Sequence, residues 1–241
     1  MKVKYIVITL LLFMFIQGFI SATLKSRTID EIDFHLKSGY EYLTEGEWKT
    51  GINNPPLTAT LSAIPLLFVK NQSVLNNFQR VRQIDYLYEA KKPFPKTLLL
   101  ISRLIPLSFM ILLGLFVFLW AKELYGAKAG LFALFLYSFS PNIISFGRLI
   151  TADIGGALFL FASMYTFWKF IRNPTKLNLL FASVMFGLAQ VTKLLAILLI
   201  PIFIFYCIVI YFLKDFKVSF FPSNNNIQIK KIIDLALPLI I

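Results

Sequence analysis

Six ionisable side chains stand at the edges of apolar segments, where an unpaired charge is costly and needs a physical explanation. Three are acids and three are bases: Asp30, Glu31 and Asp153, with Arg103, Arg148 and Lys193. A carboxylate beside a hydroxyl can take its proton as the oxygen attacks, and fixed cations can stabilise a leaving group that gains negative charge. Such chemistry requires the six residues to lie together, so the elements that carry them must be placed first.

The composition indicates a membrane protein. Of the 241 residues, 58% are hydrophobic and only 15% are charged, and the mean hydropathy is +0.73, which is too apolar for a water-soluble domain. The net charge of +12 comes from basic residues that separate apolar runs, without the interleaved aromatic patch that would favour a nucleic-acid partner. The lone Cys207 and the lone His35 exclude a disulfide framework and a Cys-based or multi-histidine metal site.

The apolar segments predict an all-α, polytopic transmembrane helical bundle. A span needs about 20 mostly apolar residues to cross the hydrocarbon core. A stretch from 177 to 213 is too long for one helix, and we divide it at Thr192-Lys193. The six expected spans are 5–23, 98–121, 129–146, 154–171, 177–191 and 194–213.

The two ends of the chain carry further expectations. The first apolar run resembles a signal peptide cleaved near Ala22, but Ile20 would then stand where processing requires a small residue, so we expect an uncleaved span. Residues 230–241 begin another apolar segment that is too short to cross a bilayer. The sequence therefore predicts a single transmembrane domain over 1–241 that is truncated within an incomplete span.

Lysine and arginine near the span ends predict the orientation. With Lys2 and Lys4 in the cytoplasm, the basic clusters at 122–128, 169–176 and 214–231 also fall inside. We therefore expect a multi-pass protein of a bacterial cytoplasmic membrane with its N-terminus in the cytoplasm. In this topology the six ionisable residues all meet the outer face.

The long outer loop, 24–97, contains two segments that predict short interfacial helices. Residues 30–43 carry apolar side chains among charges after Thr28, a candidate N-cap. Residues 57–69 form an apolar run that is too short for a span, and Pro55-Pro56 separates the two segments. Five further spans then follow within 98–213.

Each charge also has an explanation that needs no catalysis. Arg103, Arg148 and Lys193 could extend to lipid headgroups, Asp153 could cap the helix over 154–171, and Asp30 with Glu31 could be solvated residues of a loop. The small residues Ala152 and Gly156 have a spacing that predicts close helix packing. Lys193 fits these explanations least, because it interrupts a continuous apolar stretch.

Several motifs resemble those of the C-type (GT-C) membrane glycosyltransferases that use polyprenyl-phosphate sugars. These enzymes include the protein O-mannosyltransferases and the aminoarabinose transferases of lipid A. The first motifs are DE-x3-H-x3-GY-x-YL-x2-G at 30–46 and NPPL at 54–57. The later ones are AKELYG at 121–126, SFSP at 138–141, GR-x2-T-x-D at 147–153 and GLA-x2-TK at 187–193. The resemblance covers nearly the whole chain, although family members continue through more spans.

The resemblance implies a donor whose sugar is linked through phosphate to a polyprenol, and a lipid, glycan or protein hydroxyl as acceptor on the outer face. Asp30 is then the first candidate for the base and Glu31 the second. Lys193 and Arg148, with Arg103 behind them, are the candidate ligands of the donor phosphate. Asp153 would orient the acceptor or bind a divalent metal together with Asp30, and metal use stays open. The family also implies inversion at the anomeric carbon.

Two alternatives compete with an active transferase. A transporter could use the same charges to relay ions, but its binding charges would normally lie near the bilayer midplane between repeated halves, and the sequence contains no such repeat. A truncated, inactive transferase would keep the motifs without the activity.

Overall fold

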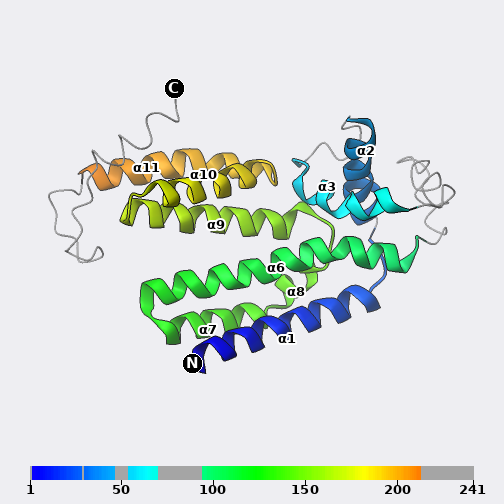
Figure 1. Ribbon diagram of the computed structural model, residues 1–241, viewed down its shortest axis with the longest axis horizontal. Helices are drawn as coiled ribbons and strands as arrows, with labels where there is room; N and C mark the ends of the chain where they lie inside the picture. The colour runs from blue at the N-terminus through cyan, green and yellow to red at the C-terminus, as the bar shows by residue number, and fades with distance from the viewer. Residues whose placement is uncertain (1, 29, 47–53, 70–93, 213–241) are drawn as a thin grey trace.

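The computed structural model describes residues 2–28, 30–46, 54–69 and 94–212. These residues form helices joined by short loops and contain no strand (Figure 1). The helices of the bundle are α1 (Lys2–Leu24), α6 (Lys96–Tyr125), α7 (Ala127–Ser138), α8 (Pro141–Gly147), α9 (Ala152–Arg172), α10 (Lys176–Gln190), η3 (Leu194–Leu198) and α11 (Leu199–Phe212). The predicted incomplete span, 230–241, lies outside the described residues.

The protein is an all-α integral membrane protein with several spans, as predicted. Helices α1, α6 and α9 are long and apolar enough to cross a membrane, and α7 with α8 forms a further candidate that is bent by 65°. The bend follows from sequence, because Ser140 takes an extended conformation before Pro141 and the residue before a proline disfavours the helical region. Helix α10 and the segment Leu194–Val209 are shorter apolar helices.

The predicted division at Thr192-Lys193 is confirmed as a break between helices. Helix α10 ends at Gln190, Lys193 has an extended conformation, and the 3-10 helix η3 begins at Leu194. Each of the six expected spans therefore corresponds to a helix or helix pair in the structure. That the shorter ones cross the bilayer stays a prediction.

Helix α6 lies at the centre of the bundle and packs against α1, α7 and α9. Its Leu107, Met110 and Leu113 are buried in one apolar core together with Met14 of α1. Phe109 meets Phe159 of α9 edge to face, with ring centroids 5.4 Å apart. Many large apolar side chains elsewhere on the helices face outward, as expected where lipid is the solvent.

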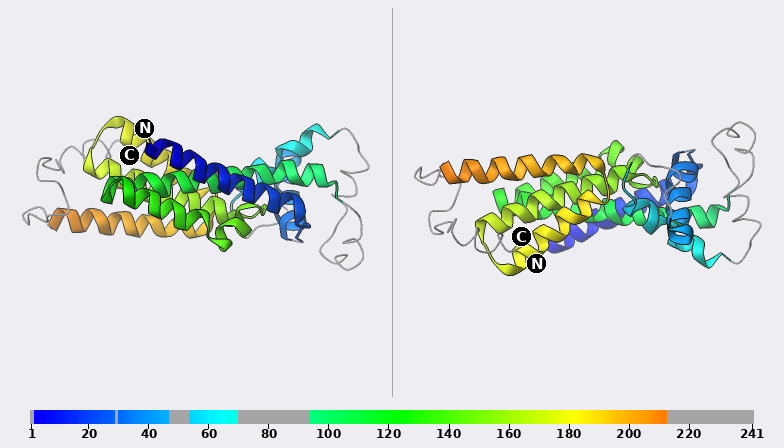
Figure 2. Two further views of the ribbon diagram at one scale, coloured as in Figure 1. Left: turned by 90° about the horizontal axis from the view of Figure 1, so that it is seen from below. Right: turned by 90° about the horizontal axis from the view of Figure 1, so that it is seen from above.

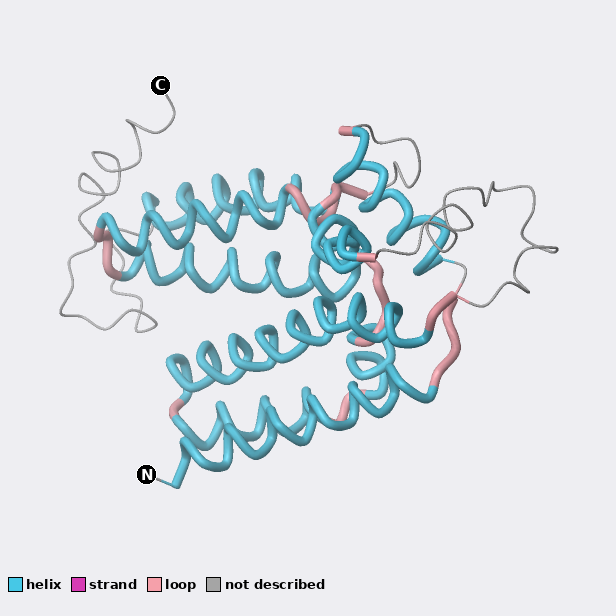
Figure 3. The backbone as a smooth tube through the Cα atoms, turned by 45° about the vertical axis from the view of Figure 1, so that its right-hand side comes forward, coloured by secondary structure: helices cyan, strands magenta, loops and turns pink. Residues whose placement is uncertain are grey.

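Short helices gather beyond one end of this elongated bundle (Figures 2 and 3). They are η1 (Asp30–Leu36), α2 (Lys37–Glu45), α3 (Leu57–Ala63) and η2 (Ile64–Phe68), which confirms helices at both predicted interfacial segments. Gly39 allows α2 to approach α3 closely, because a side chain there would overlap the backbone of Ala59. The amide of Leu57 donates to the carbonyl of Val191 at 3.0 Å, so α3 is also tied to the end of α10.

The direction of the helices brings distant segments to this same end. Helix α1 ends there, α6 begins there, and the α8–α9 and α10–η3 connections lie there as well (Figure 1). The predicted convergence of the six charged residues on one end of the bundle is therefore present. We call this end of the molecule the loop end.

Candidate functional site

Glu31 and Arg103 form a buried ion pair at the loop end. Arg103 Nε donates to Glu31 Oε1 at 2.8 Å and Nη2 donates to Oε2 at 2.7 Å, and both side chains are 0% exposed. The two-point geometry is the strongest form of an arginine–carboxylate contact. Neither group can reach solvent or a lipid headgroup.

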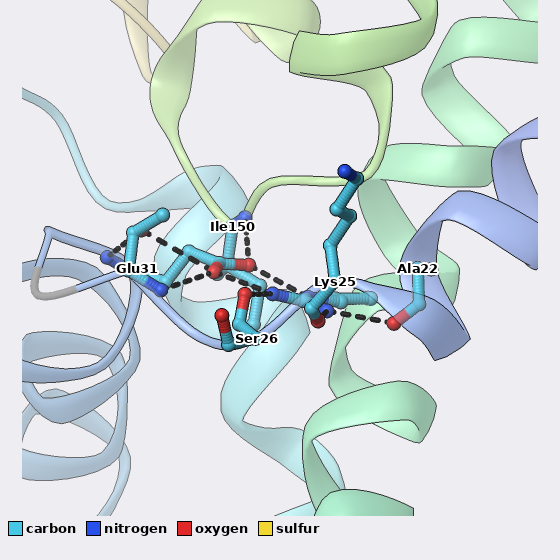
Figure 4. Close-up of polar contacts among 7 residues, drawn as sticks. Ala22, Lys25, Ser26, Glu31 and Ile150 are labelled. Atoms are coloured by element: carbon cyan, nitrogen blue, oxygen red, sulfur yellow. Dashed lines mark hydrogen bonds and ion pairs between the residues drawn. The ribbon is translucent and has the colours of Figure 1, made fainter.

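The remaining hydrogen bonds of Arg103 hold the end of the first span. Nη1 donates to the carbonyls of Ala22 and Lys25 at 2.7 and 3.0 Å, and Nη2 donates to Ser26 O at 3.1 Å. Figure 4 shows Ala22 and Lys25 on one side of the cluster and Glu31 on the other. Arg103 thus satisfies one carbonyl in the last turn of α1 and two in the loop that follows it.

Glu31 completes this hub, which we define as Glu31, Arg103 and the backbone groups they bind. Its Oε1 accepts from the amide of Ile150 at 3.3 Å and its Oε2 from the amide of Thr28 at 3.0 Å. The hub therefore joins α1, η1, α6 and the loop before α9. Each of the two groups neutralises the charge of the other, and both are shielded from solvent. These contacts do not fit Glu31 as a base or Arg103 as a phosphate ligand.

A local signal in the sequence could have identified the role of Glu31. Thr28 Oγ1 accepts from the amide of Glu31 at 3.3 Å, while the Glu31 carboxylate accepts from the amide of Thr28. This reciprocal pair is a capping box, which a Thr followed three residues later by Glu predicts. Thr28 is confirmed as a cap. The Glu31 carboxylate that completes the capping box is the same one that is buried against Arg103.

Asp30, the neighbouring acid, has the opposite environment. Its side chain is 62% exposed, and its Oδ2 lies 3.6 Å from Nε2 of His35, which is 14% exposed. Both residues belong to η1, a π-helix, a rare geometry that occurs often at functional sites. Asp30 is accessible to a reacting group, and His35 is a site residue that the sequence reasoning missed, although the DE-x3-H motif contains it.

Asp153 and Lys193 form the second ion pair of the loop end. Lys193 Nζ donates to Asp153 Oδ1 at 2.7 Å, with side chains 29% and 47% exposed. Asp153 does not cap α9, because Thr151 is the N-cap and its Oγ1 accepts from the amide of Asp153 at 3.5 Å. The carboxylate is thus free to hold the ammonium that the helix break presents.

Arg148 differs from the other two cations of the site, Arg103 and Lys193, which each pair with a carboxylate. It follows α8 and is half-buried, and its Nη1 is buried without a hydrogen-bond partner in the part of the chain that the structure describes. Burial and the nearby charge of Arg103 lower the pKa of Arg148, against the opposing charge of Glu31. A guanidinium stays charged at neutral pH, so this nitrogen is a cationic donor that is buried without a hydrogen-bond partner among the described residues.

Electrostatic contacts join these groups into one site. The charges of Asp30, Asp153 and Glu31 each act to raise the pKa of His35. The charges of Arg103 and Glu31 act on the pKa of Arg148 in opposite directions. Within the described ranges, no three His, Cys, Asp or Glu side chains gather as metal ligands would. A metal held by Asp30 and Asp153 would thus have few protein ligands.

The histidine gives the loop end a testable pH dependence. Burial lowers the pKa of His35 from its ordinary 6.5 despite three carboxylates nearby, so below about pH 6.5 the unfolded chain binds this proton more readily than the folded one. Stability should therefore fall as the pH drops through that value. We expect the melting temperature to fall more between pH 7.5 and 5.5 for the unmodified protein than for His35→Gln. A larger fall in the variant would mean that the ion pair with Asp30 outweighs burial.

A comparison with known proteins identifies the family of the chain. A family model described as dolichyl-phosphate-mannose-protein mannosyltransferase matches residues 99–219, half of the 241-residue chain. No curated protein and no solved structure matches the chain. The matched region includes Arg103, Arg148, Asp153 and Lys193, and it confirms the resemblance that the motifs indicated.

Proposed function

This chain belongs to the dolichyl-phosphate-mannose-protein mannosyltransferase family, and on that premise we propose that it moves a sugar from a polyprenyl-phosphate donor to a hydroxyl. The acceptor is a lipid, a glycan or a protein. We infer that the loop end is the reacting end and faces the outside of a bacterial cytoplasmic membrane, as the distribution of lysine and arginine predicts. Membership makes the protein a membrane glycosyltransferase of the C type, and the donor, acceptor and side of action are our proposal.

One observation carries the proposal. The end of the lipid-exposed bundle that carries the accessible carboxylate of Asp30 also carries the half-buried Arg148, one nitrogen of which has no hydrogen-bond partner in the described residues. A donor with a polyprenyl tail would keep the tail in lipid beside the helices and bring its phosphate to their ends. This end of the bundle thus offers a base for the acceptor and a cation for the donor.

Asp30 is the proposed general base. As the acceptor oxygen attacks the anomeric carbon, its proton passes to the Asp30 carboxylate, and the bond between that carbon and the phosphate oxygen breaks with its electron pair. The products are the glycoside, a polyprenyl monophosphate and protonated Asp30. Direct attack of this kind inverts the anomeric configuration.

The cations have separate roles in this scheme. The donor is a phosphodiester with one negative charge, which Arg148 offsets on binding. The leaving monophosphate gains further charge, and Lys193 is the second cation that can approach it, from its resting contact with Asp153. Interactions that strengthen only as charge develops lower the barrier without tightening substrate binding.

The hub positions these groups and takes no part in the reaction. Glu31 and Arg103 fix η1 against the loop before α9, which sets Asp30 relative to Arg148 and Asp153. The buried pair carries no net charge, so it adds nothing to the total charge of the site.

The test uses the full chain in vesicles supplied with radiolabelled mannosyl polyprenyl phosphate, and it follows the release of polyprenyl phosphate. Arg148→Met should weaken binding of polyprenyl phosphate by about 10-fold or more, since a hydrogen bond to a charged group contributes roughly 1.5–3 kcal/mol. Arg172→Met is the matched control, because Arg172 lies over Trp168 at the opposite end of the bundle. Equal binding in the Arg148 variant, or no release by the unmodified chain, would contradict the proposal.

A further inference from the structure

Gly156 of α9 lies directly beneath the side chain of Lys193. A Cβ atom added to Gly156 would stand 2.8 Å from Cδ, 3.1 Å from Cβ and 3.5 Å from Cγ of Lys193. The three nearest atoms to that position all belong to this one lysine. The missing side chain of Gly156 therefore makes the space in which the lysine stem lies.

The stem and the ammonium of Lys193 both rest on the same helix. Gly156 and Asp153 are three residues apart on α9 and so share a face. The stem crosses Gly156, and Nζ then meets Asp153 Oδ1 at 2.7 Å. A lysine at a membrane boundary would otherwise extend its flexible stem toward the headgroups, so the glycine and the aspartate together keep the ammonium within the site.

We propose that Gly156 is a positioning residue for Lys193, and that its lack of a side chain determines where the ammonium stands. This inference rests on the proposed function, in which Lys193 stabilises the leaving phosphate. It differs from the packing role that the small-residue spacing predicts, because what fills the space is a functional side chain and not the face of a neighbouring helix. The adjacent Gly155 does have the packing role, since Thr58, Phe109 and Thr192 surround it.

The geometry allows Gly156→Ala to separate positioning from folding. The shortest contact of the new methyl group, at 2.8 Å, is with Cδ of the flexible lysine stem, while Lys193 Cβ at 3.1 Å has to give by a few tenths of an ångström. Alanine is more favourable than glycine within a helix, which offsets this cost. We expect the melting temperature to stay the same or rise. A lowered melting temperature would show that Gly156 supports more than Lys193 and would overturn the assignment.

Kinetics then test the role itself, with mannosyl polyprenyl phosphate as donor. Gly156→Ala should lower kcat by about 10- to 100-fold with little change in KM, because a displacement near 1 Å can cost 100-fold. Gly187→Ala is the matched control: it is another glycine within a helix, and nothing within 4 Å in the described part of the chain would meet its Cβ. That variant should keep the kcat of the unmodified protein.

A double variant distinguishes this inference from the proposed function. In a Lys193→Met background, Gly156→Ala should lower kcat no further, because the side chain that the glycine positions is already without its charge. A multiplicative loss would overturn the positioning role while leaving the proposed function intact. If Lys193→Met alone leaves kcat unchanged, the proposed role of Lys193 fails and the inference fails with it.

Discussion

Replacing Glu31 with glutamine is expected to lower the free energy of unfolding by about 3–5 kcal/mol, the usual cost of removing one partner of a buried ion pair. The variant leaves the guanidinium of Arg103, which is 0% exposed, without its counter-charge. Glutamine keeps an acceptor oxygen for only one of the amides of Thr28 and Ile150, so the loss combines the missing charge with one broken hydrogen bond. Chemical or thermal unfolding in detergent measures it.

Two further variants make this prediction specific. Arg103→Met should cost a similar amount, and the double variant should cost clearly less than the sum of the two, since one partner has no value without the other. Glu123→Gln is the matched control, because Glu123 pairs with Lys169 at the opposite end with side chains 34% and 41% exposed. Exposed pairs contribute about 0–1 kcal/mol, and a loss of equal size there would contradict the importance of burial.

Replacing Asp30 with asparagine is expected to reduce sugar transfer by about 100- to 10,000-fold, the range over which general bases contribute. Asparagine has nearly the same shape, and the side chain it replaces is 62% exposed, so folding should be unaffected. Binding of polyprenyl phosphate should also be unchanged, because the acid does not hold the phosphate. Release of polyprenyl phosphate from the labelled donor gives the rate.

The outcome separates the two adjacent acids of the site from the control acid at the opposite end of the bundle. Glu31→Gln should lose stability, Asp30→Asn should lose turnover at full stability, and Glu123→Gln should lose neither. Unchanged turnover in Asp30→Asn would remove Asp30 as the base and leave Asp153 as the remaining candidate, which Asp153→Asn would then test.

The sequence places Asp30 and Glu31 side by side, yet the fold gives them opposite environments. Glu31 faces Arg103 and the apolar neighbours Ile32 and Leu36 are buried in a core with Leu66 and Ile150, while Asp30 faces outward. The buried structural acid thus fixes the helix on which the proposed base stands.

The amino-acid sequence alone determined the class of the protein and the location of its helices. Hydropathy is a local sum, so it identified α1, α6 and α9, the division at Thr192-Lys193 and the two interfacial segments. The alternation of successive spans then implied that the charged residues meet at one end. These features depend on neighbours in the chain or on counting spans, and both can be read directly.

Only the tertiary structure decided which charge meets which. Glu31 and Arg103 are 72 residues apart, and Asp153 and Lys193 are 40 apart, so their pairing depends on how each helix is rotated and how far it is shifted along its axis. The same rotation placed Gly156 under Lys193 and left one nitrogen of Arg148 without a partner among the described residues. Residue type fixes what a side chain can do, but burial and partner fix its role, and both arise from packing between distant segments.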